Sequence, residues 1–95
     1  MRRAARTDSN HAEIIKAARS VGATVVDLSA VGNGCPDAAL GYKGKTILIE
    51  IKDGSKSPSR RVLTPEQQTF HREWRGHAAI IESVEQLFVL LGVKA

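Results

Sequence analysis

The first strong pattern in the chain is that of a helix with one apolar side. Asn10 and Glu13 are spaced as in a capping box, and Gly22 is suited to end a helix that covers residues 9–20. Residues 24–28, Thr-Val-Val-Asp-Leu, then predict a short β-strand. Apolar positions at helical spacing form the stripe on the helix: Ile14, Ile15, Ala18 and Val21.

A β-hairpin is predicted between Asp37 and Lys52. Two strand-like runs flank Lys43 and Gly44, a pair of residues suited to a tight turn. The second run, residues 46–52, is apolar on both faces, which is typical of a central strand covered on each side.

The turn predicts the register of this hairpin. A two-residue turn would pair Tyr42 with Lys45, which places Asp37 opposite Glu50 further along the hairpin. The Cβ atoms of the two carboxylates would then lie about 5 Å apart. A register slip of two residues would keep them on one face of the sheet, whereas a slip of one residue would separate them.

The C-terminal third predicts a helix, a strand and a second helix. Thr64 is suited to the N-cap, Pro65 to the first helical position and Gln67 to the third position of a capping box. This helix is expected to end near Gly76, and a strand over residues 78–81 and an apolar helix follow it.

These elements predict one α/β domain over residues 1–95, with a core between about residues 9 and 91. The order is αβββαβα, a mixed central sheet flanked by helices. No apolar run approaches the roughly 18 residues of a membrane span, so no membrane partner is expected. The single cysteine rules out an internal disulfide and favours a reducing, cytoplasmic compartment.

The positive charge of the chain is clustered. Lys and Arg number 14 against 10 acidic residues, a net charge of +4. Clustered cations are typical of proteins that bind a phosphate backbone, although a solvated face kept for solubility would look the same. The clusters are an N-terminal group, a pair at the hairpin turn and a loop group: Arg2, Arg3 and Arg6; Lys43 and Lys45; Lys56, Arg60 and Arg61.

Glu50 is the most informative residue in the chain. An ionised carboxylate inside an apolar strand costs several kcal/mol unless it is paired or binds a cation. Lys52 shares its face, because strand side chains alternate. Two carboxylates as close as Asp37 and Glu50 repel each other, which favours a hard divalent ion such as Mg²⁺ between them.

Pro36-Asp37, followed after twelve residues by Glu50-Ile51-Lys52, resembles the signature of the PD-(D/E)XK nuclease superfamily. The helix that carries Glu13 ahead of it, and the run from Thr64 to Gln67 behind it, resemble more narrowly the virus-type replication-repair nuclease (VRR-NUC) domain. The resemblance covers residues 9–91 and implies the αβββαβα core of restriction endonucleases.

The resemblance also implies roles for individual residues. Asp37 and Glu50 would hold Mg²⁺ or Mn²⁺, with the main-chain carbonyl of Ile51 and the Glu13 carboxylate as further ligands. Two other side chains would complete the site. Lys52 would orient the attacking water and stabilise the scissile phosphate, and the amide of Gln67 or its neighbour Gln68 would also face the site. Glu13 and Gln67 each have a purely structural alternative in their capping boxes.

The expected function is a metal-dependent DNA endonuclease in a phage or bacterial cell. The resemblance implies a structure-selective enzyme, similar to Holliday junction resolvases, that cuts branched or duplex DNA as a homodimer. The main alternative is a nucleic-acid-binding module that uses the fold without cutting. The histidines show no metal-ligand spacing with one another or with Cys35, which favours surface or phosphate-contacting roles for them: His11, His71 and His77.

Overall fold

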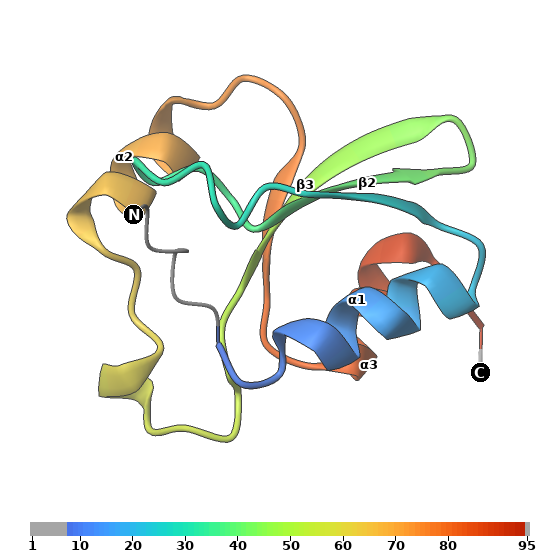
Figure 1. Cartoon of the computed structure of the whole chain (residues 1–95), viewed down its shortest axis with the longest axis horizontal. Coiled ribbons are helices and arrows are strands. Elements are labelled where there is room, and N and C mark those ends of the chain that lie inside the picture. The colour runs from blue at the N-terminus through green and yellow to red at the C-terminus, as the bar shows by residue number, and fades with distance from the viewer. Residues whose placement is uncertain (1–7, 95) are drawn as a thin grey trace.

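A computed structural model of the chain describes residues 8–94, and this part contains four strands, three α-helices and a short 3₁₀ helix (Figure 1). The N-terminal basic group, Arg2, Arg3 and Arg6, lies outside the described residues. The predicted element order is confirmed. The elements are α1 (His11–Ser20), β1 (Thr24–Asp27), β2 (Ala38–Tyr42), β3 (Lys45–Ile51), η1 (Pro58–Arg60), α2 (Pro65–Glu73), β4 (Ala78–Ile81) and α3 (Val84–Leu91).

The four strands form one mixed sheet in the order β1-β2-β3-β4. Pairing is antiparallel from β1 to β3 and parallel between β3 and β4, so β3 is central as predicted. Tyr42 pairs with Lys45, and the same register continues to Ala38 and Ile49. Lys43 and Gly44 both have positive φ, 50° and 79°, as expected of the two-residue turn whose twist matches that of the flanking strands.

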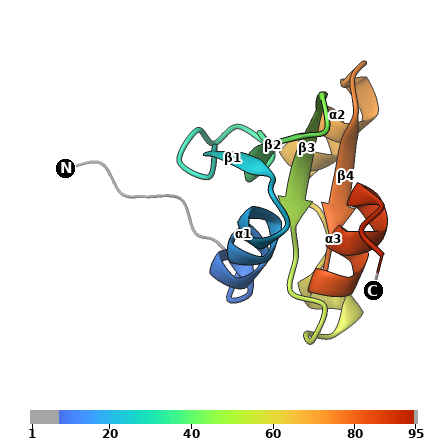
Figure 2. The same cartoon turned by 90° about the vertical axis from the view of Figure 1, so that its right-hand side faces the viewer.

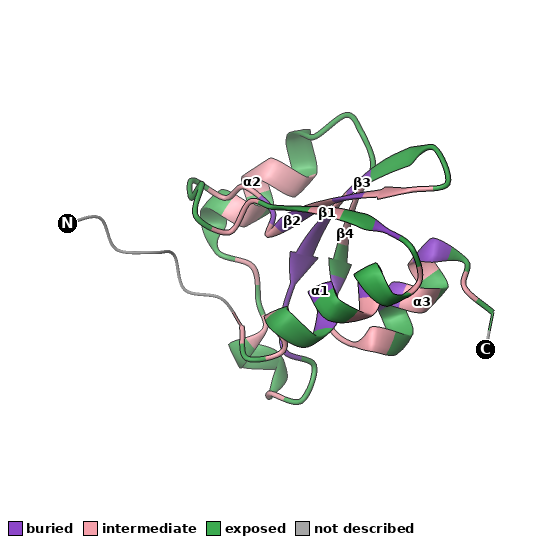
Figure 3. Cartoon of the chain, turned by 45° about the vertical axis from the view of Figure 1, so that its right-hand side comes forward, coloured by how far each residue is buried: buried purple, intermediate pink, exposed green. Residues whose placement is uncertain are grey.

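The hydrophobic core lies between one face of the sheet and the helices α1 and α3. Ile47, Ile49 and Ile51 of β3 point to this face and are almost fully buried. Ile14 and Leu87 cover them from α1 and α3, which pack side by side (Figures 1 and 3). Each such side chain contributes about 1.5–3 kcal/mol by leaving water, so this layer holds most of the fold together.

Alternation along β3 directs its even-numbered side chains to the opposite face, where α2 lies (Figure 2). α2 begins with the predicted capping box. The Thr64 hydroxyl accepts from the Gln67 main chain, and the Gln67 side chain accepts from the Thr64 main chain. In contrast to α1 and α3, α2 has no fully buried residue. Its attachment to the sheet therefore depends on a few partly buried side chains, among them Gln67 and His71.

The first turn of α1 differs from the prediction. The helix begins at His11, and Asn10 occupies the N-cap position without a side-chain capping bond, so the expected capping box with Glu13 is wrong. The Asn10 amide instead donates to the carbonyls of Lys52 (3.1 Å) and Glu82 (3.3 Å). These bonds connect the start of α1 to the residues just after β3 and β4. The Asn10 side chain makes them in place of a capping bond within α1.

Gly34 holds the loop before β2 against the start of α2. Its φ is +80°, and a Cβ added to it would lie 2.4 Å from the main-chain oxygen of Glu66. Such a distance is impossible without moving the first turn of α2. The glycine thus lets the strand that follows Pro36 approach the helix closely.

Gly34→Ala is expected to destabilise the fold more than Gly32→Ala. Gly32 has nearly the same φ, +78°, with nothing within 4 Å of an added Cβ, so both variants carry the left-handed backbone cost of about 1–2 kcal/mol. Only Gly34→Ala adds overpacking, a further 1–3 kcal/mol or so. Urea unfolding of the two variants measures the difference, and equal stabilities would contradict the close packing.

No helix within residues 8–94 combines the length and the apolar character that a membrane span requires.

Candidate active site

Asp37 stands immediately before β2 and reaches across to β3. Its main-chain N–H donates to the Ile49 carbonyl (2.9 Å), and its Oδ2 accepts from the Ile51 N–H (2.7 Å). The confirmed register stops one pair earlier, at Ala38 and Ile49, and its next step would bring Asp37 to Glu50. The two carboxyls do interact, because the Asp37 carboxyl raises the pKa of Glu50.

Glu50 is 2% exposed and lies on the face of β3 that α2 covers. Its Oε2 accepts from the Gln67 amide at 3.2 Å, whereas its buried Oε1 has no hydrogen-bond partner among the described residues. Burial, and then the hydrogen bond and charge of Asp37, raise the pKa of Glu50 to about 9, against a smaller opposing effect of Lys52. Glu50 therefore holds a proton at neutral pH unless a cation replaces it.

Lys52 is also buried, and its Nζ donates to Gln67 Oε1 at 3.0 Å. One amide thus joins the lysine and the carboxylate, since the same side chain donates to Glu50 and accepts from the Thr64 main chain (2.9 Å). Gln68 is exposed and donates instead to the Leu63 carbonyl. Of the two neighbouring glutamines, the structure places Gln67 at the site, with the capping box fixing its orientation.

Ile51 contributes its main chain to the site, while its side chain belongs to the core. Its N–H faces Asp37. In an extended strand the N–H and C=O of one residue point to the same edge, so the Ile51 carbonyl faces the Asp37 edge as well. This orientation agrees with the predicted role of the carbonyl as a ligand.

His71 is a neighbour of Glu50 that the sequence analysis missed. It lies one turn after Gln67 on α2, and its side chain is 14% exposed, so the expected surface role is wrong. Its Nε2 lies 3.7 Å from Glu50 Oε1, too far for a hydrogen bond. Burial lowers the pKa of His71 below its ordinary value. With an uncharged imidazole and a protonated Glu50, the contact at neutral pH is not an ion pair.

The structure does not bring Glu13 to the other predicted ligands. Glu13 is exposed and lines a separate pocket of about 420 Å³ with Asn10, Asp53 and Glu82. The physical reason is that α1 packs on the isoleucine face of β3, away from the face that carries Glu50. Asp8, just before α1, is the N-terminal carboxylate whose charge raises the pKa of Glu50.

Cys35 lies close enough to the carboxyls of Glu50 and Asp37 for their charges to affect its thiol. Burial, and then the charges of Glu50 and Asp37, raise the pKa of the Cys35 thiol. A thiol is a poor nucleophile compared with a thiolate. Nucleophilic chemistry at Cys35 is therefore disfavoured, and the carboxylates and the lysine remain the reactive groups.

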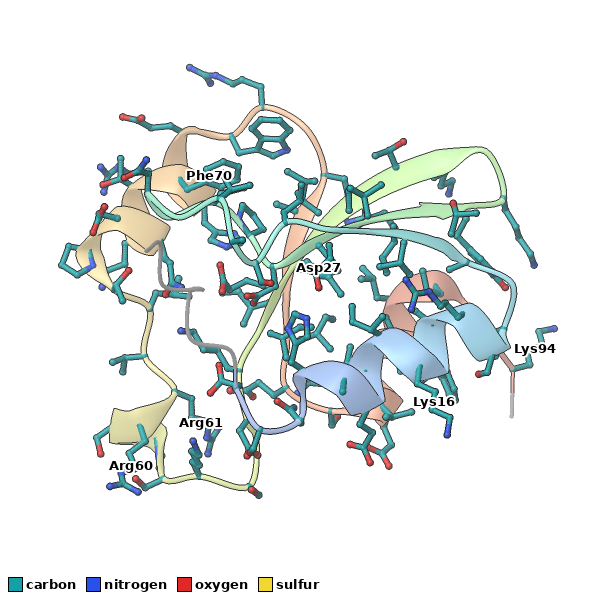
Figure 4. All side chains as sticks on the ribbon, in the orientation of Figure 1. Lys16, Asp27, Arg60, Arg61, Phe70 and Lys94 are labelled. Atoms are coloured by element: carbon teal, nitrogen blue, oxygen red, sulfur yellow. The ribbon has the colours of Figure 1, made fainter. Side chains whose placement is uncertain are left out.

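The predicted nucleic-acid-binding residues lie on two separate segments, the turn between β2 and β3 and the loop that carries Arg60 and Arg61 (Figures 1 and 4). Lys43 and Lys45 are exposed at the hairpin turn, and Lys45 lies about 17 Å from Glu50 at roughly 3.3–3.4 Å per strand residue. Arg60 is exposed on the loop between β3 and α2. Arg61 is occupied there, since it donates to the Lys56 carbonyl (2.7 Å) and pairs with Glu82 (3.1 Å).

A metal ion would find a partial site in the described chain. No three Asp, Glu, His or Cys side chains within residues 8–94 are arranged to hold an ion by themselves. The free Oε1 of Glu50 nevertheless marks a buried acceptor without a donor, and such an atom normally requires one. With Asp37 and the Ile51 carbonyl beside it, the donor set is made of oxygen, which suits Mg²⁺ or Mn²⁺.

Comparisons of the chain with known protein families, with curated proteins and with solved structures found no match. The function is therefore inferred from the chemistry of Asp37, Glu50, Lys52 and Gln67.

Proposed function

We propose that this chain is a metal-dependent DNA endonuclease of the PD-(D/E)XK kind, with the restriction-endonuclease-like core of the VRR-NUC domain. The observation that carries the proposal is the buried Glu50, held beside Asp37 and joined to Lys52 through one glutamine amide. A fold gains no stability from two carboxylates that share one buried corner. A cation brought by the reaction explains why they are there.

The chain's own residues fit Mg²⁺ or Mn²⁺. Asp37 and Glu50 would hold the ion with the Ile51 carbonyl, and Asp8, whose charge acts on Glu50, replaces Glu13 as the candidate for an additional carboxylate. When bound, the ion supplies Lewis-acid activation of water and of the scissile phosphate. Because the donors are few, water and a phosphate oxygen would complete the set, as Mg²⁺ prefers.

Lys52 supplies the only other charge that the site residues bring to this face. Held by Gln67 at 3.0 Å, its ammonium can orient a water and stabilise the negative charge that develops on the phosphate. Gln67 keeps the lysine and Glu50 in a fixed relation. We assign Gln67 as a positioning residue, since it acts through these two groups.

The proposed substrate is branched or duplex DNA, recognised through its backbone and shape. Two separate basic groups, at the hairpin turn and at the loop before α2, suit contacts with more than one phosphate segment. A single small domain leaves little surface for reading bases. A homodimer similar to Holliday junction resolvases, acting inside the cell, would place two sites on two strands.

A cleavage panel tests the function. Junction, flap, splayed and linear duplex DNA are incubated with the full chain in Mg²⁺, Mn²⁺ or a chelator. We expect cleavage that requires the metal, favours branched DNA, and is lost in Asp37→Asn but kept in Asp27→Asn, an exposed aspartate of β1. Metal-independent cleavage, or full cleavage by Asp37→Asn, would overturn the proposal. DNA binding without any cleavage would favour the non-cutting module.

A further inference from the structure

Two buried atoms with no hydrogen-bond partner face each other at the site. Glu50 Oε1 and His71 Nε2 both lack a partner among the described residues, and they lie 3.7 Å apart. One buried polar atom without a partner costs about 1–3 kcal/mol. Two such atoms at one point indicate a single missing partner that both could contact.

The chemistry of the two atoms restricts what this partner is. An uncharged imidazole offers a nitrogen lone pair, and the Glu50 carboxylate offers only lone pairs once a cation has replaced its proton. Two acceptors can share a cation. Adjacent donors on one small divalent ion lie about 3 Å apart when metal–donor distances are near 2.1 Å. A shift of less than about 1 Å from the observed 3.7 Å would bring His71 and Glu50 onto one ion.

The three side chains are not arranged to hold an ion as they stand, and we infer that after this shift His71 becomes a nitrogen ligand of the ion that Glu50 and Asp37 would bind. This inference rests on the proposed metal-dependent function and adds to it a preference among metals. Mg²⁺ takes oxygen donors almost exclusively, whereas imidazole is a common ligand of transition-metal ions, so a nitrogen ligand favours Mn²⁺ over Mg²⁺. The helix α2 brings both Gln67 and His71 to the site.

Electron spin echo envelope modulation of Mn²⁺ bound to the full chain tests for a coordinated nitrogen. We expect nitrogen modulation in the wild type, and a change in its pattern when the histidines carry ¹⁵N. The modulation should vanish in His71→Ala and persist in His77→Ala, an exposed histidine before β4. His71→Gln, which keeps a polar group of similar size, replaces His71→Ala should the latter fail to fold.

Calorimetry provides the second readout. We expect His71→Ala to weaken Mn²⁺ binding about 10- to 100-fold, with a smaller loss for Mg²⁺. Absence of nitrogen modulation in the wild type, or its persistence in His71→Ala, would overturn the inference. If Mn²⁺ then still binds and Asp37→Asn abolishes binding, the proposed function stands without His71. If Mn²⁺ does not bind the wild type at all, both proposals fall.

Discussion

Lys52→Met should lower the rate of DNA cleavage by at least about 1000-fold at saturating Mn²⁺. The variant removes the ammonium that, in the proposed mechanism, orients water and stabilises phosphate charge, and it keeps a side chain of similar length in the same buried position. Gln67 would lose its donor at 3.0 Å but keep its bonds to Glu50 and Thr64. Single-turnover cleavage of the preferred substrate measures the chemical step.

Lys45→Met is the matched control for this variant. Lys45 lies at the other end of the same strand and is exposed. If it contacts the DNA backbone, its replacement should weaken DNA binding and reduce the salt dependence of that binding, with the single-turnover rate at saturation unchanged. Calorimetry should show that Lys52→Met still binds Mn²⁺. Near-normal cleavage by Lys52→Met would remove the lysine from the mechanism.

Glu50→Gln should remove the loss of stability that the wild-type chain shows, without a bound cation, as pH rises from 5 to 9. The folded-state pKa of Glu50 is raised from 4.5 to about 9, so between these values the folded state binds more protons than the unfolded state. Its stabilising contribution is complete below about pH 4.5 and is lost as pH rises toward 9. One proton supplies at most about 1.4 kcal/mol per pH unit.

We expect the wild type to lose roughly 2–4 kcal/mol relative to Glu50→Gln between pH 5 and pH 9. In a domain of this size that difference is about 10 °C or more in Tm. Thermal unfolding in a chelator across this range measures it. Glu85→Gln, which removes an exposed carboxylate of α3, should follow the wild type. Parallel curves for the wild type and Glu50→Gln would show that Glu50 is not held protonated.

Metal and proton should compete for Glu50, so the metal should stabilise the fold most at the pH where the proton is lost. At pH 8–9, Mn²⁺ stabilises only the form in which Glu50 is ionised, so it should recover the stability that the wild type loses. Glu50→Gln should recover little. The charge of Glu50 is thus unfavourable for the bare fold and required for the proposed reaction.

The sequence predicts the elements of this fold well because its local signals agree. The turn at Lys43 and Gly44 sets the register, and the register determines that Asp37 meets Glu50. The Thr64 capping box determines the orientation of Gln67, since the side chain at the third helical position must turn back toward the helix start. Contacts between residues joined by a turn or a helix cap can therefore be predicted from the local sequence.

The residues that the sequence analysis missed are those set by packing between distant elements. His71 reaches Glu50 only because α2 crosses the sheet face, which no spacing along the chain encodes. Glu13 was expected at the site, but the apolar stripe of α1 directs that helix to the other face. The positions of His71 and Glu13 both depend on which face of the sheet their helix packs against.

The sparse packing of α2 has a consequence for how the site exchanges with solvent. Glu50 is 2% exposed, so protons and ions reach it only when the residues that cover it, Gln67 and His71 of α2 among them, move. α2 has no fully buried residue to hold it down, and brief local opening of such a helix costs far less than unfolding the isoleucine layer. Access to Glu50, the least exposed ionisable side chain within residues 8–94, is therefore controlled by α2.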